Sequence, residues 1–166
     1  TGDITQRARR RQFLDAKQFT RALKPIPVIA VPGNHDIPLY NFFARLFSPY
    51  AEFKNLFKDQ LEKDFVHGDV LVTGLNSTSR WRHVQGGFDL PRLEERLSQK
   101  APGTKFHIAA FHHPMDCRKP QDEKNLLKNS AAVMALFEQY GVDLILGGHI
   151  HDPYVTLSKV RYRSAK

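Results

Sequence analysis

Residues 26–36 read I-P-V-I-A-V-P-G-N-H-D, an apolar run that leads directly into a polar turn. The apolar run 26–31, interrupted by one proline, indicates a buried strand, and the Pro-Gly pair after it indicates a tight turn. Gly33 allows backbone conformations closed to other residues and lets another group come close. The turn then presents an amide, an imidazole and a carboxylate in succession, from Asn34, His35 and Asp36. Loops at the carboxyl ends of strands usually hold the chemistry of α/β proteins, but a plain polar turn explains four residues equally well.

Length and charge limit the class of protein. A chain of 166 residues can form one domain with a sizeable core. Its formal net charge of +8 and isoelectric point of about 9.7 favour anionic partners, such as phosphate esters, nucleic acid or acidic lipid surfaces. For Arg7 and the run Arg9 to Arg11 we prefer a solvated helix face. Since the sequence contains no zinc-finger spacing, nucleotide-binding glycine loop or RNA-binding aromatic signature, a nucleic-acid partner is not favoured.

Cys117 is the only cysteine, which excludes an internal disulfide and favours a reducing compartment. We therefore expect a cytoplasmic protein. No apolar run approaches the roughly 20 residues that a membrane-spanning helix needs.

Strand patterns alternate with helix patterns along the chain, which predicts an α/β fold. Helices are expected at 5–23, after a cap at Asp89, and at 126–140, with one or two short helices in 38–57 broken near Pro49. Besides 26–31, strands are expected in a hairpin at 65–75 that turns at Gly68-Asp69, and at 106–111, 142–146 and 153–160.

The segment 38–57 is rich in aromatic residues, and these are expected to pack in the core by default. Covering a cleft is the alternative, and the loop 76–87 could help to shape such a pocket. The aromatic residues are Tyr40, Phe42, Phe43, Phe47, Tyr50, Phe53 and Phe57.

Polar groups follow four predicted strand ends, where a parallel sheet would gather them along one edge. Three of these ends hold five of the eight histidines. The four groups are Gly2-Asp3, Gly33 to Asp36, His112-His113-Pro114 and Gly148 to His151. The other three histidines (His67, His83 and His107) are expected to be surface or structural residues.

The spacing of His149 and His151 places both imidazoles on one side of an extended chain, where they can bind one metal ion or two adjacent ions. Mixed imidazole, carboxylate and amide donors suit Mn, Fe or Zn better than Ca. Two such ions about 3.5–4 Å apart are a common device for displacement at phosphorus.

The motifs G-D, G-N-H-D, H-H-P and G-H-I-H, in this order, resemble those of the calcineurin-like metallophosphoesterase superfamily. Residues 2–8 and 32–38 are similar to its bacterial branch of cyclic-nucleotide phosphodiesterase-like proteins. The resemblance implies an α/β sandwich of mixed sheets flanked by helices. It also implies two divalent transition-metal ions (Mn, Fe or Zn) as cofactors.

The resemblance also implies a role for each motif residue. Asp3 would bridge the two ions, and His151 would bind the first ion. The second ion would be held by Asn34, His112 and His149. His35 would contact the phosphate and stabilise or protonate the leaving oxygen, and Asp36 is expected to orient His35. His113 is either a substrate-side residue or the true ligand in place of His112.

One family motif, an Asp-x-His that supplies two ligands to the first ion, is missing from this sequence. We therefore expect residues 1–166 to be a single phosphoesterase domain that lacks its first strand and its C-terminal part. The second ion should bind better than the first, and this polypeptide alone should have weak activity or none.

The expected function is metal-dependent hydrolysis of phosphoric esters, most of all phosphodiesters, by a hydroxide activated by the two ions. The substrate would be a small phosphoester, with a cyclic nucleotide as one candidate. The alternative is a catalytically impaired scaffold or binding module that retains the phosphoesterase fold. Because Asn34, His35, His112, His149 and His151 are all present, we favour the enzyme.

Overall fold

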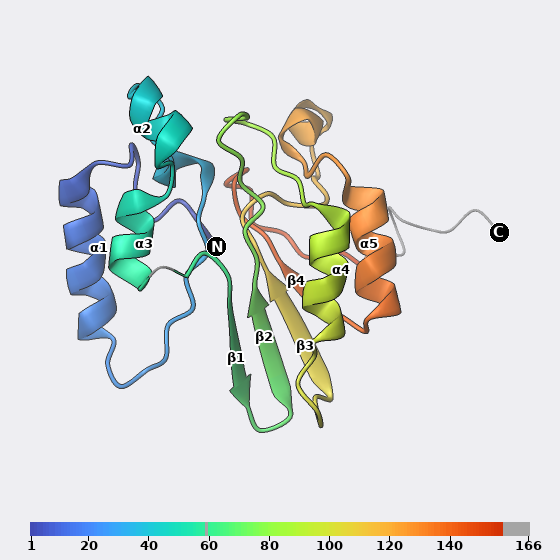
Figure 1. Ribbon diagram of the computed structural model, residues 1–166. Coiled ribbons are helices and arrows are strands. Elements are labelled where there is room, and N and C mark those ends of the chain that lie inside the picture. Colours follow the sequence, from blue (N-terminus) through green and yellow to red (C-terminus); the bar gives the residue numbers. More distant parts are fainter. Residues whose placement is uncertain (59, 158–166) are drawn as a thin grey trace.

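The sheet is built outward from a hairpin whose turn is set by Gly68, which has a φ of +59° that favours glycine. The computed structural model describes residues 1–58 and 60–157. Strand β1 (Lys63–His67) pairs antiparallel with β2 (Val70–Gly74). Strands β3 (Phe106–Ala110) and β4 (Leu144–Leu146) then add in parallel, in the order β1-β2-β3-β4 (Figure 1). The carboxyl ends of β2, β3 and β4 therefore lie along one edge.

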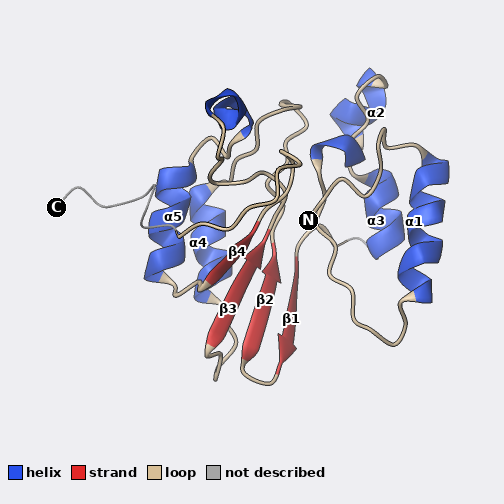
Figure 2. Cartoon of the chain, turned by 180° about the vertical axis from the view of Figure 1, so that it is seen from behind, coloured by secondary structure: helices blue, strands red, loops and turns tan. Residues whose placement is uncertain are grey.

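Helices α4 (Leu90–Ser98) and α5 (Ser130–Gln139) lie side by side against one side of the sheet (Figure 2). Asp89 caps α4 as expected, since its side chain accepts a hydrogen bond from the backbone N–H of Arg92 at 3.0 Å. The main hydrophobic core fills the space between these helices and the sheet. Its buried members include Leu93, Leu97, Phe111, Leu127, Val133 and Phe137.

Helices α1 (Arg10–Ala22) and α3 (Ala51–Phe57) form the opposite side of the molecule, with the short α2 (Phe42–Phe47) above them (Figures 1 and 2). An apolar cavity of about 810 Å³ lies between α1, the segment 28–31 and the sheet. Two 3₁₀ helices complete the described part of the chain, η1 (Asn34–Asp36) and η2 (Pro120–Asn125). No helix among the described residues is long and apolar enough to cross a membrane.

Two expectations from the first part of the sequence are wrong. Residues 26–31 are not a strand, because they pair with no strand of the sheet and residues 28–31 instead line the cavity. The first helix begins at Arg10 rather than Thr5. Thr5 is used elsewhere, since its backbone N–H and its hydroxyl both donate hydrogen bonds to Asp36, at 2.7 and 3.0 Å.

Other expected element boundaries, and the expected packing of the aromatic segment, also differ from the structure. The last helix begins at Ser130 rather than at residue 126. Residues 153–157 have no regular structure, and the rest of the expected strand 153–160 lies outside the described residues. Most of the aromatic segment does not pack in the core: Phe53 is buried, but Tyr40, Phe42, Phe43 and Phe47 are exposed.

Candidate metal centre

The parallel pairing of β3 and β4 brings two histidine motifs together. The pairing continues past the strand ends, where the backbone N–H of Phe111 donates to the carbonyl of Leu146 at 3.1 Å. One step further, the N–H of Gly148 donates to the carbonyl of His112 at 2.9 Å. His112 and His149 are thereby placed side by side, with ring centroids 4.9 Å apart.

Three of the expected metal ligands converge on Nε2 of a fourth, His112. Oδ1 of Asn34 lies 2.8 Å from this nitrogen and Nδ1 of His149 lies 3.1 Å from it. Oδ2 of Asp3 lies 3.4 Å from it. The sequence placed these residues on four separate segments, and the structure brings them into one cluster.

The protonation state of His112 indicates which kind of ligand this cluster can bind. Nδ1 of His112 lies 2.9 Å from the carbonyl oxygen of Thr1, which can only accept, so Nδ1 carries the proton. Burial lowers the pKa of His112, although the nearby Asp3 carboxylate opposes the shift, and the ring is therefore neutral. A lone pair on Nε2 then faces the oxygens of Asn34 and Asp3, which carry no hydrogen. Such a set of converging acceptors fits a cation, and its mixed N and O donors suit a transition metal.

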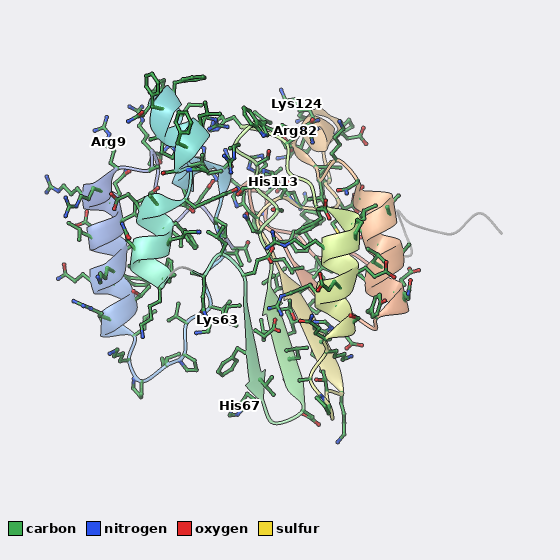
Figure 3. All side chains as sticks on the ribbon, in the orientation of Figure 1. Arg9, Lys63, His67, Arg82, His113 and Lys124 are labelled. Atoms are coloured by element: carbon green, nitrogen blue, oxygen red, sulfur yellow. The ribbon has the colours of Figure 1, made fainter. Side chains whose placement is uncertain are left out.

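His113 belongs to the same cluster. The nearest ligand atoms of His112, His113 and His149 all lie within 4.8 Å of one another. Nδ1 of His113 lies 2.9 Å from Oγ of Ser77, whereas its buried Nε2 has no hydrogen-bond partner among the described residues. Figure 3 shows His113 at the upper end of the sheet, between the two halves of the molecule. His112 makes the contacts with Asp3 and Asn34, and His113 offers a further nitrogen behind it.

The other two rings of the cluster are also kept neutral. Burial, with smaller effects from the neighbouring histidines, lowers the pKa of His113 to about 3. Burial and the neighbouring His112 lower the pKa of His149 to about 4. Neutral imidazoles are the form that binds metal ions, so no proton has to be displaced near neutral pH.

The backbone is strained at the expected ligands. Asp3, His149 and His151 have φ angles of +50°, +72° and +52°, in the left-handed region that residues other than glycine seldom adopt. Strain of this kind clusters at functional sites, because the fold must hold the residue against its preference. Ala8 and Lys58 have similar φ angles, of +49° and +55°, so three of the five strained residues among those that the structure describes are expected ligands.

A glycine makes room for the Asp3 carboxylate. A Cβ on Gly33 would collide with the backbone nitrogen and Oδ1 of Asp3. Oδ1 of Asp3 also accepts a hydrogen bond of 2.9 Å from the backbone N–H of His35. The G-N-H-D turn therefore supplies Asn34 and also fixes the orientation of Asp3.

Asp36 holds the G-N-H-D turn against the segment after Asp3. Its carboxylate accepts hydrogen bonds from the backbone N–H groups of Gly33, Ile4 and Thr5, and from the hydroxyl of Thr5. Burial raises the pKa of Asp36, and these four donors oppose the shift. The expected contact with the His35 ring is replaced by another, since Nδ1 of His35 donates to the carbonyl of Gln6 at 2.8 Å. Asp36 thus holds the turn in place directly. It affects the position of His35 only because His35 belongs to that turn.

Two other histidines, His151 and His83, lie outside the cluster of His112, His113 and His149. His151 is exposed, and no hydrogen bond joins it to the other ligands among the described residues. His83 faces His35, with ring centroids 5.4 Å apart, and burial lowers its pKa. Sequence reasoning left His83 and Ser77 out of the site, because both lie in a loop with no motif. Only the polar character of residues 76–87 was a signal.

In a comparison with family models, the model described as calcineurin-like phosphoesterase matches residues 1–153. A comparison with curated proteins found no match. The match spans the segments that carry Asp3, Asn34, His112, His149 and His151. The mixed sheet flanked by helices is consistent with the fold of this family. The chain therefore belongs to the calcineurin-like phosphoesterase family, whose chemistry is the metal-dependent hydrolysis of phosphoric esters.

Proposed function

We propose that this chain is a phosphodiesterase domain in which two divalent transition-metal ions are held by Asp3, Asn34, His112, His149 and His151. The convergence of acceptor atoms on Nε2 of His112 is the observation that carries this proposal. Bound there, divalent ions would make a nucleophile available at neutral pH and neutralise charge on the phosphoryl oxygens. Asp3, with two carboxylate oxygens, is the residue suited to lie between the ions.

The two ions should not bind equally. Asn34, His112, His149 and Asp3 would surround the second position, whereas among the described residues the first would have only Asp3 and the exposed His151. We therefore propose that the second ion binds more tightly and that turnover by this polypeptide is weak. Manganese, iron and zinc all fit a mixed N and O donor set.

His35 is placed to handle a proton. Its Nδ1–H donates to the Gln6 carbonyl, which leaves Nε2 as the atom that can gain or give a proton. We propose that protonated Nε2 donates to the leaving oxygen of the substrate. General acid catalysis of this kind contributes about 10²–10⁴ in rate, and less when the leaving group is already a good one.

The substrate class that we propose is a small phosphodiester, with a cyclic nucleotide as one candidate. The similarity of residues 2–8 and 32–38 to phosphodiesterase-like proteins supports this choice. A hydrolysis panel would test it, with Mn²⁺, Fe²⁺ and Zn²⁺ each offered with bis-(para-nitrophenyl) phosphate, para-nitrophenyl phosphate and a cyclic nucleotide. We expect the diesters to be cleaved faster than the monoester.

The panel includes Asn34→Ala and a matched control, Asn55→Ala, which removes an exposed amide on α3. Loss of a metal ligand should lower the rate by about tenfold or more, whereas the control should keep it. Full activity in Asn34→Ala would show that the site is assigned wrongly. Metal binding without hydrolysis of any ester would instead favour the scaffold alternative.

A further inference from the structure

Five exposed aromatic side chains lie on two segments that a hydrogen bond joins, and we call them the aromatic rim. They come from the segment that includes α2 and from the loop 76–87, and between 67% and 81% of each side chain is exposed. The rim consists of Tyr40, Phe42, Phe43, Phe47 and Trp81. Large apolar side chains exposed together usually mark an interaction surface.

Hydrogen bonds join the two segments into one surface. The guanidinium of Arg80 donates to the carbonyl of Leu46 at 2.6 Å, which fixes the loop to the end of α2. Below this contact, the hydroxyl of Tyr50 lies 2.8 Å from Oγ1 of Thr78. These two hydrogen bonds therefore hold the two segments of the rim together.

The charge of the rim has a single sign. Residues 37–51 and 76–88 contain Arg45, Arg80 and Arg82 but no aspartate or glutamate. Figure 3 shows Arg82 and Lys124 along the same upper edge of the molecule, above His113. The partner of this surface should therefore carry negative charge.

We propose that the aromatic rim docks on the surface of an anionic lipid bilayer. Aromatic side chains enter the boundary between headgroups and acyl chains, while arginines beside them pair with lipid phosphates. Both groups come from α2 and the loop 76–87, which lie at the upper end of the molecule and are joined by the hydrogen bond between Arg80 and Leu46 (Figure 1). Single-stranded nucleic acid also combines aromatic and cationic contacts, but it follows a groove, whereas these side chains project outward.

Docking through the rim would bring the metal centre close to the lipid headgroups. The loop that carries Trp81 also carries His83, whose ring faces His35 at 5.4 Å, and Val84, whose backbone bonds to His149. The proposal concerns binding alone, so it stands or fails independently of the proposed hydrolysis.

Trp81 is the only tryptophan, so its fluorescence reports directly on the rim. The whole chain, without added metal, would be mixed with vesicles of phosphatidylcholine containing about one third phosphatidylglycerol, and with vesicles of phosphatidylcholine alone. We expect cosedimentation and a blue shift of Trp81 emission with the anionic vesicles, both reduced by salt.

Variants distinguish the contribution of the aromatic side chains from that of the arginines. Phe42→Ser with Phe43→Ser should lower the partition coefficient by about tenfold, and Arg82→Gln, which leaves the contact between Arg80 and Leu46 in place, should lower it by about fivefold. Val66→Ser and Lys63→Gln change exposed residues of β1, distant from α2 and the loop in Figure 1, and should leave the coefficient unchanged. Circular dichroism would confirm that each variant is folded.

Three outcomes would overturn the proposal. The first is an absence of cosedimentation with anionic vesicles, and the second is equal loss in rim and β1 variants. The third is a shift of Trp81 emission by a single-stranded oligonucleotide but not by vesicles, which would make the rim a nucleic-acid surface.

Discussion

Gly33 is the residue at which the smallest chemical change should disturb the site most. In Gly33→Ala the new methyl group would meet the backbone nitrogen and Oδ1 of Asp3, so the Asp3 carboxylate must move. We expect the affinity for Mn²⁺ to fall by about tenfold or more, with a loss of about 1–3 kcal/mol in unfolding free energy. Isothermal titration and urea unfolding would measure the two effects.

Gly87→Ala is the control for this change. Its nearest neighbour would be Oδ1 of Asn129 at 3.6 Å, an ordinary contact distance. The variant should bind Mn²⁺ as the unchanged chain does. Equal affinities for Gly33→Ala and Gly87→Ala would show that close packing against Asp3 does not matter for the site.

Substitution of Asp36 tests whether its carboxylate holds the G-N-H-D turn in place. In Asp36→Asn one of the two oxygens is replaced by an amino group, which would face two of the four donors that now point at the carboxylate. Buried donors without partners cost about 1–3 kcal/mol each, so urea unfolding should show a loss of about 2 kcal/mol or more. Asp15→Asn, at an exposed position of α1, should change stability little. A neutral effect of Asp36→Asn would mean that the hydrogen bonds to Asp36 do not hold the turn.

Strand β3 carries a buried histidine that should make stability depend on pH. Nε2 of His107 lies 2.9 Å from the hydroxyl of Thr73 on β2, its buried Nδ1 has no partner among the described residues, and burial lowers its pKa. The unfolded chain takes up a proton near pH 6.5, whereas the folded strand resists it. His107 therefore contributes full stability above about pH 6.5 and loses it as the pH falls.

The histidines of the metal centre act in the same direction when no metal is bound, since His112, His113 and His149 also have lowered pKa values. In the presence of a chelator, the unfolding free energy should fall from pH 7 to pH 5, with a slope of up to about 1.4 kcal/mol per pH unit for each such histidine. His107→Leu should reduce this slope. A stability that is constant or rises toward pH 5 would contradict the burial of neutral imidazoles.

Among the secondary-structure elements, the features that depend only on neighbouring residues in the sequence were predicted correctly. The hairpin at Gly68 and the cap at Asp89 were predicted correctly, because a turn and a cap depend on neighbours in the sequence. The strand at 26–31 was predicted wrongly, because a strand also needs a hydrogen-bonding partner that no local pattern guarantees. The helix start at Thr5 was wrong because Asp36, 31 residues away, engages Thr5.

Across the molecule, four of the five expected ligands lie together, whereas His151 is exposed and makes no hydrogen bond to them among the described residues. Parallel strand ends account for the meeting of His112 and His149, and the structure adds Asp3 and Asn34 to the same point. The roles of His83 and Ser77 depend on how the loop 76–87 folds over the site, which no motif recorded. The aromatic residues of α2 were assigned to the core because composition does not tell an exposed surface from a buried one.

Metal binding should stabilise the whole fold, because its donors come from segments far apart in the chain. Mn²⁺ at about 100 times its dissociation constant should add about 2.7 kcal/mol to the unfolding free energy. Thermal unfolding with Mn²⁺ and with a chelator would measure this gain, which Asn34→Ala should lose and Asn55→Ala should keep. A melting temperature that Mn²⁺ leaves unchanged would mean that the unfolded chain binds it equally well or that neither state binds it.

We propose that Asp3, Asn34, His112 and His149 surround one metal ion. The most direct measurement is equilibrium binding of Mn²⁺ or Zn²⁺ to the whole chain, compared with His112→Ala and with His67→Ala, which removes an exposed histidine on β1. We expect one tightly bound ion per chain, lost in His112→Ala and kept in His67→Ala, with a second ion bound weakly. Equal binding by all three proteins would contradict the assignment of this centre.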